Sequence, residues 1–84
     1  MTHAQFETLT ALQSVGIGTG DYFLASIIFP ARTNKDSGHR RTLANLKRAG
    51  LLGPGKIPWA NDAYQMLPGT YEKASRYKER LCER

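Results

Sequence analysis

Residues 40–52 read RRTLANLKRAGLL, and this segment is the most informative one in a chain of 84 residues. Leu43 and Leu46 are three residues apart, and two further leucines follow Gly50. Apolar residues at this spacing form one edge of a helix, and a glycine commonly ends one. Asp36 and Ser37 are both of a type that begins helices well. The segment therefore predicts a helix with a buried leucine edge and an exposed basic side.

Two helices are predicted before this one. Residues 2–15 carry apolar side chains at helical spacing, with Thr2 as the cap and Gly16 as the end of the helix. Residues 22–29 are mostly large and apolar, and they are predicted to form a second, largely buried helix. The apolar positions of the first helix are Phe6, Leu9, Leu12 and Val15.

A hairpin and a last helix are predicted after it. Residues 56–59 and 63–67 read as two short strands, with a turn at residues 60–62 between them. Trp59 is expected to pack onto the core beneath the hairpin, and the alternative is an aromatic platform on which a nucleobase stacks. Proline suits the first turn of a helix, so the last helix is predicted to run from Pro68 to about Cys82.

Two side chains have more than one interpretation at this point. Tyr71 and Tyr77 lie on the predicted last helix, and they either pack on the first helix or form a dimer contact. His39 lies one turn before Leu43, and it is expected to pack or cap rather than to catalyse, because no acid or nucleophile lies near it in the sequence.

Length and composition predict a single domain over residues 1–84 with one small core. The longest apolar run is too short to span a membrane, and the N-terminus lacks the pattern of a secretory signal. The single cysteine cannot form an internal disulfide. These features together predict a cytoplasmic protein.

Charge is distributed unevenly along the chain. The formal net charge is +5, yet residues 1–30 contain no Lys or Arg, and all 12 basic residues lie in residues 31–84. A basic face on a small domain attracts polyanions, of which nucleic acid is the commonest. The alternative interpretation is that the charge only keeps the protein soluble.

Residues 40–52 resemble the recognition helix of bacterial winged helix-turn-helix regulators of the MarR and PadR kind. Those helices typically read Ser-Arg-x-Leu-x-x-Leu-x-x-x-Gly-Leu-Ile, and here Arg40 replaces the serine. Six positions match the pattern: Arg41, Leu43, Leu46, Gly50, Leu51 and Leu52. Downstream, residues 64–69 resemble in part the segment in which the second wing strand enters the next helix. The threonine and spacer usual there are missing, and the connection over residues 29–37 is longer than the usual tight turn.

The resemblance implies a mainly α fold with a small β-hairpin, of the winged helix-turn-helix type, covering roughly residues 20–80. It implies a bacterial or phage DNA-binding protein that acts in transcription regulation, as a repressor, or as an excisionase. Double-stranded DNA is the expected partner, and a homodimer is left open. No cofactor or metal is expected.

Physical chemistry indicates how the third helix would contact DNA. The major groove admits one helix, arginine can grip a guanine edge bidentately, and asparagine can do the same for adenine. Bases further along the helix meet phosphates instead. The candidate DNA-binding residues are Ser37, Arg40, Arg41, Asn45, Lys47, Arg48, Lys56 and Lys35, and Asn61 and Arg32 lie near enough in the sequence to assist.

Enzymatic patterns are almost absent from the sequence. The two histidines and the cysteine do not have metal-ligand spacing, and no serine lies in a nucleophile elbow. The glycine-rich residues 16–20 lack the preceding strand and third glycine of a dinucleotide-binding loop. We therefore expect no enzyme. The second hypothesis is a winged helix that binds an acidic protein partner through its basic face, as a small inhibitor or adaptor.

Overall fold

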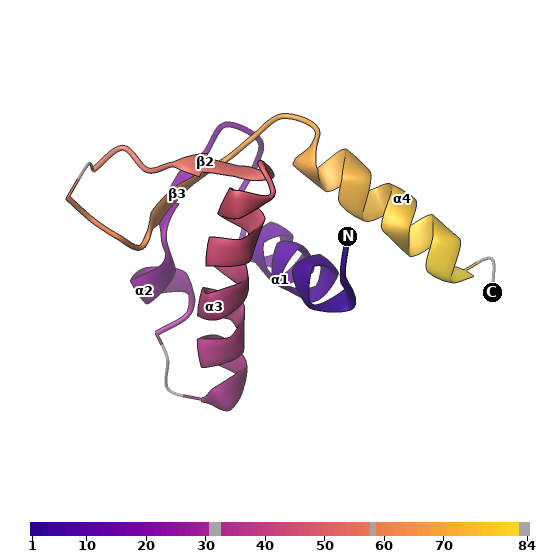
Figure 1. Cartoon of the computed structure of the whole chain (residues 1–84), viewed down its shortest axis with the longest axis horizontal. Helices are drawn as coiled ribbons and strands as arrows, with labels where there is room; N and C mark the ends of the chain where they lie inside the picture. Colours follow the sequence, from indigo (N-terminus) through magenta and orange to yellow (C-terminus); the bar gives the residue numbers. More distant parts are fainter. Residues whose placement is uncertain (31–32, 58, 83–84) are drawn as a thin grey trace.

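The computed structural model describes residues 1–30, 33–57 and 59–82. It is mainly helical, with a small antiparallel sheet (Figure 1). The described elements follow the order α1 (His3–Ser14), β1 (Tyr22–Leu24), α2 (Ala25–Ile28), α3 (Asn34–Arg48), β2 (Leu52–Pro54), β3 (Ala63–Met66) and α4 (Thr70–Cys82).

The first helix forms as predicted, except that Val15, the last of its predicted apolar positions, lies past the helix end and is 59% exposed. Thr2 caps α1 through a capping box, in which its side chain accepts from the Gln5 N–H and the Gln5 side chain accepts from the Thr2 N–H. Gly16 has a φ of 90°, which a residue with a side chain rarely adopts, so the helix ends there. Leu9 and Leu12 are fully buried.

The predicted second helix is wrong over its first half. Residues 22–24 form strand β1, and only Ala25–Ile28 makes a single helical turn, α2. β1 pairs antiparallel with β3, with Phe23 opposite Tyr64. A continuous apolar run fits a buried strand as well as a buried helix, and here the pairing partner, which lies far along the chain, determines the outcome.

The start of α3 differs slightly from the prediction. The helix begins at Asn34 rather than near Asp36 or Ser37, because the Thr33 hydroxyl accepts from the Asp36 N–H and caps it. Its end was predicted correctly, since α3 stops just before Gly50, which has a φ of 79°.

The first predicted hairpin strand is wrong, whereas the second, predicted at residues 63–67, forms as β3 (Ala63–Met66). β2 is Leu52–Pro54, directly after α3, and residues 56–57 and 59 are not in a strand. Pro58 lies outside the described residues. β2 pairs with β3 with Leu52 opposite Met66, which buries both side chains. The sheet order is therefore β1-β3-β2, and residues 55–62 form a long loop between β2 and β3.

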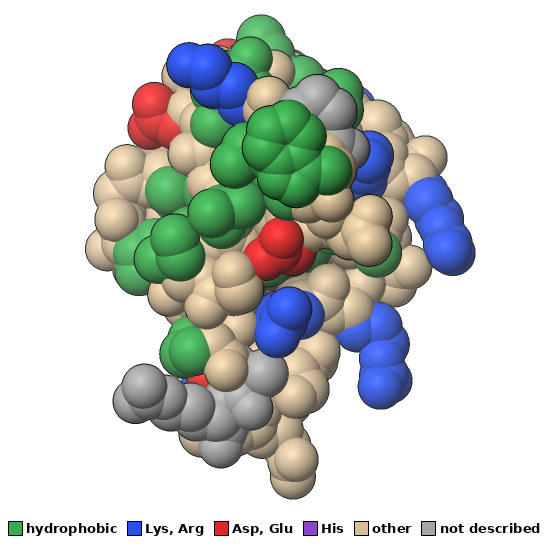
Figure 2. Space-filling model, turned by 90° about the vertical axis from the view of Figure 1, so that its left-hand side faces the viewer, with side chains coloured by type: hydrophobic (Ala, Val, Ile, Leu, Met, Phe, Trp, Pro, Cys, Tyr) green, Lys and Arg blue, Asp and Glu red, His purple; other side chains and the backbone are tan. Residues whose placement is uncertain are grey.

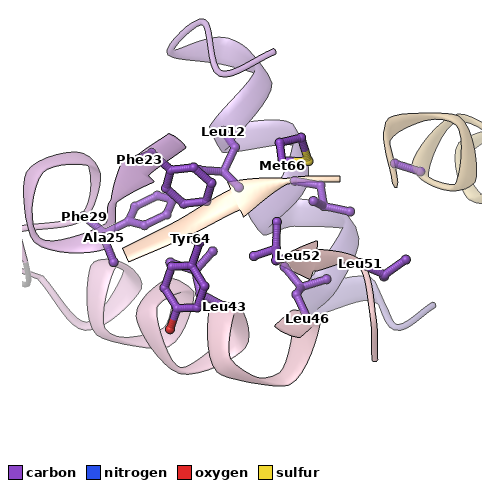
Figure 3. Close-up of a cluster of buried hydrophobic side chains, with 12 residues drawn as sticks. Leu12, Phe23, Ala25, Phe29, Leu43, Leu46, Leu51, Leu52, Tyr64 and Met66 are labelled. Atoms are coloured by element: carbon purple, nitrogen blue, oxygen red, sulfur yellow. The ribbon is translucent and has the colours of Figure 1, made fainter. Parts of the chain in front are cut away.

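One core joins α1, α3 and the sheet. The labelled side chains of these elements converge on one another in Figure 3. The largest buried apolar members are Leu9, Leu12, Phe23, Phe29, Leu43, Leu46, Leu51, Leu52, Tyr64 and Met66.

The last helix begins at Thr70 rather than at Pro68, because Pro68 and Gly69 form a turn before it. The Thr70 hydroxyl donates a 2.6 Å hydrogen bond to the Leu51 carbonyl. Tyr71 donates its hydroxyl to the Ile17 carbonyl, and the Tyr77 ring lies 5.2 Å from the Phe6 ring. Both tyrosines therefore pack toward α1 and the turn after it, which is the first of the two interpretations left open.

Candidate nucleic-acid interface

A ridge of exposed side chains runs along the outer side of α3. Its members are Ser37, Arg41, Ala44 and Arg48, with Asn45 beside them, and all are exposed. They are spaced four, three and four residues apart, which places them on one face of a helix. We call this set the α3 ridge. It lies opposite the side of α3 that is buried.

The buried side of α3 holds the ridge in place. Leu43 and Leu46 are 0% exposed, and His39 is 8% exposed. The His39 ring stacks on the Phe29 ring at 4.8 Å, and its Nδ1 lies 2.7 Å from the Thr8 hydroxyl on α1. His39 is thus a packing residue, as predicted, and it fixes the N-terminal half of α3 against α1 and the end of α2.

The other predicted basic residues lie at different places around α3. Arg40 and Lys47 are two turns apart and flank the ridge on one side, with Arg40 partly buried and Lys47 exposed. Lys35 lies away from the ridge, because it lines a hollow between α1 and α3 together with Thr10 and Ser14. Arg32 lies outside the described residues. The ridge and its flank thus bring together six of the eight predicted residues.

The loop between β2 and β3 carries the remaining candidate, Lys56, which is exposed. Lys56 and Ile57 line a shallow hollow with Tyr22 and Leu24, so this part of the loop lies over β1. Asn61 is exposed near the other end of the loop. Trp59 was expected to pack onto the core, and this prediction is wrong, because the side chain is 84% exposed. The physical reason is that β2 pairs four residues earlier than predicted, which leaves Trp59 in the loop.

Asp62 connects this loop to α2. Its carboxylate accepts the Ser26 N–H at 3.1 Å, and its backbone carbonyl accepts the Ala25 N–H at 2.8 Å. Hydrogen bonds from the Ser26 side chain and backbone lower the pKa of the Asp62 carboxyl, and the positive charge of Arg40 adds to this effect.

Within the described residues, the basic side chains of the interface form no close ion pair, although the charge of Arg40 acts on Asp62. The one contact closer than 4.0 Å between a basic and an acidic side chain there joins His3 and Glu7, on α1. The positive charge of the α3 ridge therefore remains available to a partner.

Exposed apolar side chains lie near the basic ones, and sequence reasoning did not identify them as surface residues. Ile27 is 72% exposed on α2, and Tyr22 is 51% exposed on β1. Figure 2 shows hydrophobic side chains gathered on the face that carries α2 and the β2–β3 loop, with separate Lys and Arg side chains around them. The sequence did not predict this exposure, because residues 22–29 were expected to form a buried helix. Residues 22–24 instead form a strand at the edge of the sheet.

Other chemistry is not apparent in the part of the chain that the structure describes. No three His, Cys, Asp or Glu side chains in those residues come together as metal ligands. None of the helices there combines the length and apolarity of a membrane span. The side chain of Cys82 lies outside the described residues.

Comparison of the chain with protein-family models, curated proteins and solved structures finds no match.

Proposed function

We propose that this chain is a winged helix-turn-helix DNA-binding module in which α3 is the recognition helix. The observation that carries the proposal is the α3 ridge, an exposed face bearing Arg41, Asn45 and Arg48 on a helix whose other side is locked into the core. A helix that presents such a face fits the major groove, which is about 12 Å wide.

The topology supports the same proposal. A strand precedes α2 and α3, two strands follow them, and the first strand joins the sheet beside the last in the order β1-β3-β2. Residues 55–62 then correspond to the wing. This arrangement fits the resemblance carried by residues 40–52.

The residues divide into two roles in this proposal. Arg41 and Asn45 lie on the ridge and are assigned to base edges, since their side chains can make bidentate contacts to guanine and adenine. Phosphate contacts, which position the protein without reading sequence, are assigned to Arg40, Lys47, Arg48 and Lys56. Lys35 has no role here, because it lies in the hollow between α1 and α3.

The biological role that fits a single module of this kind is a small transcription regulator, or a repressor or excisionase of a mobile element. The competing proposal is a winged helix that binds an acidic protein. It predicts no sequence-specific affinity for duplex DNA, and so the same binding experiment separates the two.

The test compares Arg41→Ala with Arg76→Ala by fluorescence anisotropy on labelled duplexes. Both arginines are exposed and both changes remove one positive charge, but Arg76 lies on α4. We expect Arg41→Ala to weaken binding about 5- to 150-fold and to relax specificity at one base pair, because a base-reading arginine is worth about 1–3 kcal/mol. Arg76→Ala should change affinity little.

Circular dichroism melts of both variants serve as the folding control. Equal affinity of Arg41→Ala and the unaltered protein for every duplex would remove Arg41 from the interface. A complete lack of duplex binding by the unaltered protein at about 50 mM salt, where such complexes are strongest, would contradict the DNA-binding proposal.

A further inference from the structure

We infer that Trp59 is a nucleobase-stacking residue, whose indole ring enters and opens a base step of the bound duplex beside the contacts made by α3. This inference rests on the proposed function and deepens it. The basic residue of the β2–β3 loop indicates only a contact to phosphate, and Trp59 adds an aromatic contact to the bases.

The first argument is exposure. Trp59 is 84% exposed, although tryptophan is on average a highly buried residue. An indole ring left in water retains its capacity for apolar and stacking contacts, and clusters of such side chains mark interaction sites. Ile27 and Tyr22 add exposed apolar surface on the neighbouring α2 and β1.

The second argument is that the loop is braced at both ends. At its start, a Cβ on Gly55 would lie 2.1 Å from the Ala63 Cβ, so the chain passes too close to β3 for any side chain. At its end, Asp62 accepts hydrogen bonds from Ala25 and Ser26 at the start of α2. A braced loop loses less conformational entropy on binding than a free one.

Within the loop, a local turn presents Trp59. The Ala60 N–H donates to the Ile57 carbonyl at 3.2 Å, which closes a turn around the tryptophan. Trp59 therefore lies in a hydrogen-bonded turn, and its ring is exposed to solvent.

The third argument is charge, which selects nucleic acid over an apolar protein surface. Lys56 lies three residues before Trp59, and Arg40 lies close enough to the end of the loop for its charge to lower the pKa of Asp62. Asp62 itself is occupied by its hydrogen bond to Ser26. Basic side chains that hold the phosphate backbone beside a bulky side chain that enters a base step are a combination that duplex-binding proteins use.

The experiment uses Trp59 as its own reporter, because it is the only tryptophan in the chain. Duplex is titrated into the full chain while two signals are recorded: the anisotropy of a dye on the DNA and the emission of the tryptophan. We expect tryptophan emission to be quenched along the same curve as the anisotropy rises, since stacking on a base brings the indole into contact with it.

Three variants separate stacking from other effects. Trp59→Ala should weaken binding by at most about 150-fold, because it loses a stacking contact worth about 1–3 kcal/mol per base but no longer has to open the base step. Trp59→Phe should keep most of the affinity, because its ring still stacks. Val15→Ala removes an exposed apolar side chain at the end of α1 and should leave binding unchanged.

Three other outcomes of these experiments would overturn the inference. Binding by anisotropy with unchanged tryptophan emission and unaltered affinity of Trp59→Ala would leave the proposed function intact and remove Trp59 from the interface. A blue shift of emission with rising protein concentration and no DNA would show that a second copy of the chain covers the ring. Absence of any anisotropy change would contradict the proposed function itself, and the inference with it.

Discussion

At the scale of single residues, Asp62 joins two elements of the fold by hydrogen bonds. One residue at the end of the β2–β3 loop accepts hydrogen bonds from two backbone N–H groups at the start of α2, one through its carbonyl and one through its carboxylate. The first N–H groups of a helix have no partner within the helix, so these contacts satisfy donors that would otherwise bond to water. Asp62 therefore fixes α2 and the loop relative to each other.

The Asp62→Asn variant should make stability depend less on pH. Because the folded-state pKa of Asp62 is lower than its unfolded value, the carboxylate stabilises the fold above the unfolded pKa, and this contribution is lost as pH falls through the folded pKa. At pH 7 we expect Asp62→Asn to cost at most about 1 kcal/mol, since contacts of exposed charges are weak.

Thermal melts followed by circular dichroism at pH 7 and at about pH 3, below the usual aspartate pKa of about 3.9, measure the effect. The difference in melting temperature between the two proteins should shrink at the lower pH. Glu72→Gln, on exposed α4, is the matched control. A difference that stays constant between the two pH values would contradict this role of Asp62.

Residue-level prediction succeeded where the relevant chemistry is local. His39 was predicted to pack because nothing near it in the sequence fits catalysis, and it is buried against Phe29. Its partner Thr8 lies 31 residues away and was not predicted, although Thr8 directly precedes Leu9 on the buried side of α1. Trp59 was predicted wrongly because hydrophobicity favours burial, whereas the strand register that places this residue in a loop is not visible locally.

At the scale of elements, the orientation of α3 about its axis determines which of its side chains a partner can reach. Leu46 is 0% exposed, and its neighbour Asn45 lies on the exposed side. The assignment of Arg41 and Arg48 to the outer face depends on this orientation.

The Leu46→Ala variant should be strongly destabilised. Truncating a buried leucine costs about 2–5 kcal/mol, and a small domain has only about 5–15 kcal/mol of stability in total. Asn45→Ala, one residue away, should melt within a few degrees of the unaltered protein, because surface changes usually cost little. A Leu46→Ala melting temperature equal to that of Asn45→Ala would show that the helix is turned differently, and the ridge would have to be redrawn.

Helices and strands were predicted correctly where neighbouring residues determine them, and wrongly where residues far along the chain do. The ends of α1 and the C-terminal end of α3 were predicted closely, since Thr2, Gly16 and Gly50 act on their own neighbours. β1 was missed because the strand exists only through its pairing with β3, about 40 residues later. Helical spacing alone predicts which residues of α3 lie on the exposed side, and so most residues of the candidate interface could be predicted from the sequence.

At the scale of the whole molecule, positive charge does not lie on one face alone. Figure 1 shows α4 on the opposite side of the molecule from α2 and the β2–β3 loop. α4 carries four basic residues of its own, Lys73, Arg76, Lys78 and Arg80, and all are exposed. A net charge of +5 therefore predicts attraction to polyanions without saying which face binds them.

The salt dependence of duplex binding distinguishes these arrangements. Each neutralised phosphate changes the slope of log affinity against log salt by about −0.9, so contacts from Arg40, Lys47, Arg48 and Lys56 predict a slope of about −4 for a monomer between about 50 and 200 mM salt. If the four basic residues of α4 also contacted phosphates, the slope would be about −7, and Arg76→Ala would then reduce it by about 1. We expect Arg76→Ala to leave the slope unchanged and Arg48→Ala to reduce it by about 1. A protein-binding module would instead show a gentler dependence on salt with its acidic partner, because it releases no condensed counterions and responds only to ordinary screening.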